Sequence, residues 1–178
     1  MPRCEVCFRH CEIEEGKTGF CMARTVKDGK VTAANYGYLT GIALDPIEKK
    51  PLARFFPGSR ILSVGSYGCN LRCPFCQNSE ISWGPGVNVF AGHKSENILF
   101  VAPTELVSLA ERYAGEGNIG VAFTYNEPLT GYEYVRDTAK LVHEKGMKNV
   151  LVSNGTAELS ALEPQRHAVR KRRNCAGW

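Results

Sequence analysis

Residues 60–76 read RILSVGSYGCNLRCPFC, and this stretch decides the fold prediction. Residues 61–64 form a short apolar run without helical periodicity, which is typical of a buried strand. A loop that carries Cys69, Cys73 and Cys76 follows directly. The stretch therefore predicts a strand whose carboxyl end presents a compact group of thiols.

The sequence after this loop alternates between helical and extended patterns. Thr104 can cap a helix whose apolar residues recur at helical spacing as far as Tyr113. A strand is expected over residues 119–125, a helix over 132–146 and a further strand over 149–152. Because parallel neighbours need a crossover, and a helix supplies it, this order predicts an α/β fold with a parallel sheet.

Polar segments follow the expected strands. The cysteine loop follows the first, Asn126-Glu127-Pro128 the second and Ser153-Asn154-Gly155 the third. Ligands of parallel sheets gather at the carboxyl ends of the strands. We therefore expect the three segments to meet at one edge of the sheet.

Residues 1–58 have a different character, and we expect them to form a small Cys-rich extension. An Asp28-Gly29 pair predicts a hairpin turn, and residues 45–51 read as a loop. The extension also holds four closely spaced cysteines, Cys4, Cys7, Cys11 and Cys21. Four thiolates suit a closed zinc site, a single iron or a second iron–sulfur cluster, with disulfides or free thiols as the alternative.

Composition narrows the class of protein. The chain has 178 residues, of which 43% are hydrophobic and 22% charged, as is typical of a soluble globular protein. No apolar run could span a bilayer, and residues 1–19 lack the apolar centre of a signal peptide, so we expect a cytoplasmic protein without a membrane partner. Eight cysteines in that compartment favour metal binding or catalysis over disulfides.

The three central cysteines lie at spacings of four and three residues, compact enough for one loop to wrap a small inorganic cluster. Thiolate is the ligand that iron in such clusters requires. A zinc knuckle or buried thiols are the alternative, but structural zinc needs four ligands and no fourth lies nearby. Three ligands would leave one iron open to an external molecule, whereas a ferredoxin-type carrier fills all four positions.

The loop, with an aromatic Phe75 before its third cysteine, resembles the signature of radical S-adenosylmethionine (SAM) enzymes. Residues 68–78, 45–52 (DPIEKKPL) and 125–128 (YNEP), with the leading cysteines, more narrowly resemble AmmeMemoRadiSam system radical SAM enzymes. Those proteins are similar to pyruvate formate-lyase activating enzymes. The resemblance covers residues 1–163.

The resemblance implies a TIM-like (β/α)6 barrel, present here over residues 59–163 as about three units. It also implies a [4Fe–4S] cluster on the central cysteines, whose open iron is chelated by SAM. Reductive cleavage of SAM would then give a 5′-deoxyadenosyl radical for hydrogen abstraction. The family's cofactor segment falls on Tyr125, Asn126 and Glu127, although other members more often have two glycines before the Glu-Pro pair. Asn154 is a further cofactor candidate from its place after a strand, and no catalytic residue is assigned.

Partners and rival functions remain open in the sequence. An electron donor such as ferredoxin or flavodoxin is expected, and the substrate is a protein, as for a glycyl-radical activase, or a small molecule. The alternatives are a non-catalytic iron–sulfur or zinc module for electron transfer and an inactive truncated fragment. Residues 164–178 are basic and lose the family resemblance, so we expect a disordered or frameshifted tail rather than a nucleic-acid-binding one.

Overall fold

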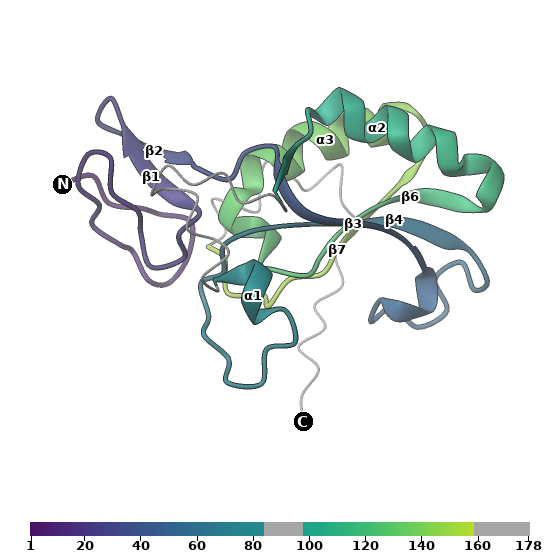
Figure 1. The fold of residues 1–178 in the computed structure, drawn as a ribbon, viewed down its shortest axis with the longest axis horizontal. Helices are drawn as coiled ribbons and strands as arrows, with labels where there is room; N and C mark the ends of the chain where they lie inside the picture. The colour runs from purple at the N-terminus through teal and green to yellow at the C-terminus, as the bar shows by residue number, and fades with distance from the viewer. Residues whose placement is uncertain (84–97, 159–178) are drawn as a thin grey trace.

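The computed structural model describes residues 1–83 and 98–158 (Figure 1). Its centre is a five-stranded sheet with the order β5-β3-β4-β6-β7. The strands are β3 (Tyr38–Pro46), β4 (Arg60–Ser66), β5 (Leu99–Phe100), β6 (Asn118–Phe123) and β7 (Lys148–Leu151). Within the described residues this sheet is open and does not close into a barrel.

The central strands are parallel, as the alternation of patterns predicts. β4 pairs with β6 in parallel, and β6 pairs with β7 in the same way. The sheet is nevertheless mixed, because β3 pairs antiparallel with β4 and β5 pairs antiparallel with β3. The structure is therefore a mixed α/β fold with a partly parallel sheet, consistent with a partial radical SAM fold.

Two helices, α2 (Pro103–Arg112) and α3 (Tyr132–Glu144), cover one face of the sheet (Figure 1). The main core lies between them and the strands, and its buried residues include Leu62, Val64, Leu106, Val121, Phe123, Val135 and Ala139. Thr104 does not cap α2, contrary to the prediction. Pro103 occupies the first turn, and the Glu105 carboxylate instead accepts a hydrogen bond from the Ala102 N–H at 2.7 Å.

Among the described residues, the opposite face of the sheet carries only short elements. The 3-10 helix η1 (Ile47–Lys49) contributes Ile47 to a small core with Ile61, Ala122 and Val150. Helix α1 (Ser79–Ser82) follows the cysteine loop and lies on this side in Figure 1. Two further 3-10 turns, η4 (Tyr113–Glu116) and η5 (Pro128–Gly131), precede β6 and α3.

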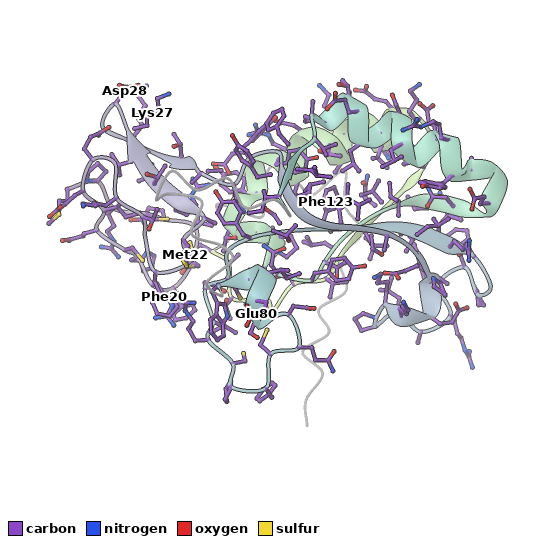
Figure 2. All side chains as sticks on the ribbon, in the orientation of Figure 1. Phe20, Met22, Lys27, Asp28, Glu80 and Phe123 are labelled. Carbon is purple, nitrogen blue, oxygen red and sulfur yellow. The ribbon has the colours of Figure 1, made fainter. Side chains whose placement is uncertain are left out.

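The beginning of the chain forms a hairpin of β1 (Arg24–Lys27) and β2 (Lys30–Ala33). Its turn is the predicted Asp28-Gly29 pair, with φ angles of 52° and 70°, and Lys27 and Asp28 lie at its far tip in Figure 2. The expected extension over residues 1–58 is shorter in the fold, because β3 belongs to the main sheet. We use N-terminal extension below for residues 1–37.

The predicted basic tail, residues 164–178, lies outside the described residues. Within residues 1–83 and 98–158, no helix has both the length and the apolar character needed to cross a membrane.

Candidate functional site

The three polar segments meet at the carboxyl edge of the sheet, which confirms the expectation drawn from their order. The Asn70 side chain donates to Thr156 Oγ1 and accepts from Asn154 Nδ2, each at 2.8 Å. The backbone N–H of Asn154 in turn donates to Glu127 Oε2 at 2.7 Å. We call this the ligand edge: residues 66–76, 124–128 and 153–156.

Asn126 joins the end of β6 to the end of β4. Its Nδ2 donates to the Gly68 carbonyl at 2.9 Å, and its Oδ1 accepts from the Ser66 N–H at 3.1 Å. Both contacts lie within the three residues that precede Cys69. The predicted cofactor segment therefore fixes the backbone from which the cysteine loop starts.

Glu127 is buried behind the ligand edge, with 2% of its surface exposed. Its carboxylate accepts hydrogen bonds from Leu129 N–H at 3.0 Å, Ser153 Oγ at 2.9 Å and Asn154 N–H at 2.7 Å. Burial raises the pKa of this carboxyl group, against the lowering effect of those donors. The side chain thus holds the ends of β6 and β7 together.

Tyr125 has a left-handed backbone, with φ at 73°, which is rare for a bulky residue. Its Oη donates to Asp45 Oδ2 at 2.8 Å. Asp45 also accepts from Lys50 at 2.9 Å and from the exposed Lys49 at 3.0 Å. Although burial alone would raise the pKa of Asp45, these hydrogen bonds hold it well below its usual range.

The Asp45 group was not predicted from the sequence, which reads there as a loop. A carboxylate followed by two lysines is the signal that could have suggested it. Gly65 completes the arrangement, because a Cβ at this position would lie 2.8 Å from the Tyr125 Cβ. Tyr125 is therefore fixed by its hydrogen bond to Asp45 and by the space that Gly65, which has no side chain, leaves for it.

Cys69, Cys73 and Cys76 are partly exposed on a single loop at the ligand edge. A backbone hydrogen bond of 3.1 Å from Cys76 N–H to the Cys73 carbonyl closes the loop's turn. Burial raises the pKa of Cys69, and the nearby Glu127, Cys73 and Cys76 raise it further. All three thiols thus belong to one short, partly exposed loop.

The donor set fits an iron–sulfur cluster, since three accessible thiols sit together on a short loop. Among residues 1–83 and 98–158, however, no three His, Cys, Asp or Glu side chains are already placed to hold a metal ion. Phe75 has 76% of its surface exposed and extends away from the packed core.

The four cysteines of the N-terminal extension converge as well. Cys4, Cys7, Cys11 and Cys21 line one small cavity, together with Arg9 and Arg24 among others. Burial raises the pKa of Cys21 to about 11, and Cys4 and Cys7 contribute in the same direction. The convergence agrees with a shared role for the four thiols.

Comparison with known proteins gives the class to which this site belongs. The family described as the Radical SAM superfamily matches residues 63–168, more than half of the chain. The chain therefore belongs to the radical SAM superfamily, whose members are typically enzymes that bind a [4Fe–4S] cluster and cleave SAM.

Two curated relatives come from Methanocaldococcus jannaschii. The uncharacterized protein MJ0808 is 40% identical over 161 residues, which cover 90% of this chain and 45% of that protein. A 7-carboxy-7-deazaguanine synthase is 24% identical over 99 residues, which cover 55% of this chain and 41% of that enzyme. The chain thus spans less than half the length of the relatives it matches.

Proposed function

We propose that this chain binds a [4Fe–4S] cluster through Cys69, Cys73 and Cys76 and places SAM at the ligand edge for reductive cleavage. The observation that carries the proposal is the meeting of the cysteine loop with residues 125–128 and 153–156. When bound, the reduced cluster supplies one electron that breaks a carbon–sulfur bond of SAM, giving methionine and a 5′-deoxyadenosyl radical that abstracts hydrogen from substrate.

The protein's own residues hold and orient the two cofactors. Cys69, Cys73 and Cys76 would hold three irons of the cluster and would leave the fourth open to an external ligand. Side-chain hydrogen bonds of Tyr125 and Asn126 fix the backbone of residues 125–127. In this proposal that backbone faces the amino group of SAM. Asn154 lies beside them, hydrogen-bonded to Asn70, where its position suits a polar part of the cofactor.

Glu127 acts in this proposal by position rather than by direct contact. Both of its oxygens already accept hydrogen bonds within the protein. The carboxylate therefore keeps the two strand ends at a fixed separation, and the cofactor meets the backbone in front of it.

The test is SAM cleavage by the full chain. After anaerobic reconstitution and reduction with a low-potential donor, the protein should convert SAM to 5′-deoxyadenosine and methionine. Cys73→Ala should abolish the product, and Cys175→Ala, which removes a thiol of neither group, should leave it unchanged. A fully loaded cluster that yields no 5′-deoxyadenosine would instead support a non-catalytic electron-transfer module.

The finer assignments extend this proposal. A ferredoxin or flavodoxin would supply the electron, and a glycyl-radical partner protein is one class of substrate. Incubation of the reduced enzyme with SAM and a candidate protein would show a glycyl radical by electron paramagnetic resonance. A small-molecule substrate would instead quench the radical without a protein-bound signal.

A further inference from the structure

The cavity lined by Cys4, Cys7, Cys11 and Cys21 is small. Its volume of about 10 Å³ is close to the space that one water molecule occupies. A cube of four irons and four sulfides is far larger than one atom. The cavity therefore fits a single ion better than a second cluster.

Two tight turns bring these cysteines to the cavity. His10 has φ at 42° and directly precedes Cys11. Its N–H donates to the Cys7 carbonyl at 3.1 Å. Met22 has φ at 65°, follows Cys21 and donates to the Gly19 carbonyl at 2.9 Å. Positive φ is uncommon outside glycine, so both turns hold an unfavourable backbone next to a thiol.

A buried cation without a complete set of partners lies beside the thiols. Arg24 lines the cavity with only 4% of its side chain exposed. Its Nη1 donates to the Glu133 carboxylate at 2.7 and 2.8 Å. Its Nε is buried and has no hydrogen-bond partner among the described residues. An N–H of this kind is suited to a metal thiolate, which carries negative charge.

The N-terminal extension has little apolar material of its own. Its buried cluster consists of Cys4, Val6, Ile13 and Val26. Segments this small usually need a metal or disulfides to fold, because their cores are too limited. Cys4 belongs to this apolar cluster and Cys11 packs against it, so metal binding by these thiols would supply the missing stabilisation.

We propose that Cys4, Cys7, Cys11 and Cys21 bind one structural zinc ion, and that this centre supports the cysteine loop of the ligand edge. Zinc prefers four thiolates in a closed tetrahedral site. Arg9 and Arg24 offset the net negative charge of that centre. Movement of the thiols between staggered rotamers is the adjustment that binding requires of them.

The support reaches the ligand edge through short contacts. The Cys69 N–H donates to the Cys21 carbonyl at 3.2 Å, and Arg9 Nε donates to the Asn70 carbonyl at 2.7 Å. Arg72 donates to the Phe20 carbonyl at 3.3 Å. Figure 2 shows Phe20 and Met22 on the side of the extension that faces the cysteine loop. Residues 20–22 thus form part of the base on which the loop rests.

The zinc site is tested in a background without the cluster. The full chain with Cys69→Ala, Cys73→Ala and Cys76→Ala should retain one equivalent of zinc per chain after purification under reducing conditions. Adding Cys11→Ala should lower the zinc content about tenfold or more. Because this background lacks the cluster ligands, the result is independent of SAM cleavage.

Cobalt substitution of the same triple variant covers the case in which Cys11→Ala does not fold. Tetrahedral thiolate–cobalt absorption would support the site without any change to the four cysteines. Iron with sulfide in the triple variant, disulfides among the four cysteines, or no bound metal would each overturn the proposal.

Support of the loop is tested by hydrogen exchange. Removal of zinc from the triple variant with a chelator should accelerate exchange of the amide at position 69 about tenfold or more, while amides of β6 keep their rate. An unchanged rate at position 69 would overturn the support of the loop.

Discussion

Cys4, Cys7 and Cys21 are buried around one cavity, whereas Cys69, Cys73 and Cys76 are partly exposed on a loop. Beside the first group lie the cationic side chains of Arg9 and Arg24. The second rests on a network of hydrogen bonds in which Asn126 and Asn154 donate and the Glu127 carboxylate accepts. The difference teaches that a site open to a ligand needs hydrogen bonds from other side chains to fix the position of its ligand-binding loop. A closed site can be held by its own ligands.

The largest expected effect comes from removing one cysteine from each of the two groups in turn. Cys73→Ala should abolish 5′-deoxyadenosine formation and leave zinc content unchanged. Cys11→Ala should remove zinc and raise proteolysis within residues 1–37 about tenfold or more. Elemental analysis and limited proteolysis of both variants give the comparison. Equal loss of zinc in the two variants would show that the regions are not separate sites.

Asp45→Asn should have the next largest effect. The change leaves the buried Lys50 ammonium without its counter-charge and should cost about 3–5 kcal/mol of unfolding free energy at pH 7. Urea unfolding measures it. Glu144→Gln, at an exposed carboxylate, is the matched control, with a change below about 0.5 kcal/mol.

The stability difference between wild type and Asp45→Asn should depend on pH. The pKa of Asp45 is lower in the folded state than its unfolded value of about 3.9. Its stabilisation is therefore complete above that value and is lost as the pH falls through the folded pKa. The difference between wild type and Asp45→Asn should shrink below about pH 4. A constant difference down to the acid limit would contradict the ion-pair account.

Much of the site follows from local sequence patterns, and the rest depends on contacts between distant residues. The parallel strands and the meeting of three polar segments follow from periodicity and from the crossover rule. The pairing of β3 with β4 and the Asp45–Tyr125 bond join residues far apart in the chain. No local pattern fixes such partners, so residues 45–51 read only as a loop.

Arg9 and Arg24 illustrate the same limit at the other site. The cysteine spacing predicts that four thiols come together, because ligand spacing is local. The cations beside them depend on how the extension folds against α3 and the cysteine loop. Charge alone in the sequence does not distinguish a buried arginine from an exposed one.

Glu127→Gln tests how the ligand edge is held from behind. The amide group places an N–H donor where the carboxylate accepts from Leu129 or Asn154, which should cost about 1–3 kcal/mol of unfolding free energy. Urea unfolding of the cluster-free protein measures it. Iron content after reconstitution should fall with it, and unchanged values of both quantities would contradict the role of this carboxylate.

Tyr125→Phe should have the smallest effect. It removes the Tyr125 hydrogen bond to Asp45, while the hydrogen bonds from Lys49 and Lys50 remain, and should cost about 1 kcal/mol. A double-mutant cycle with Asp45→Asn should show strong non-additivity, because the two side chains interact directly. Additive losses would mean that Tyr125 is held by its packing against Gly65 and not by Asp45.

Gly68 has a consequence for how such a protein can be divided or recombined. A Cβ at this position would lie 2.5 Å from the Ala23 Cβ and 2.8 Å from the Cys21 carbonyl oxygen. The extension and the cysteine loop thus touch at backbone distance, with no side chain larger than the Ala23 methyl group between them. Residues 1–37 are therefore not an exchangeable module, and a graft from another protein would have to match the loop backbone atom for atom.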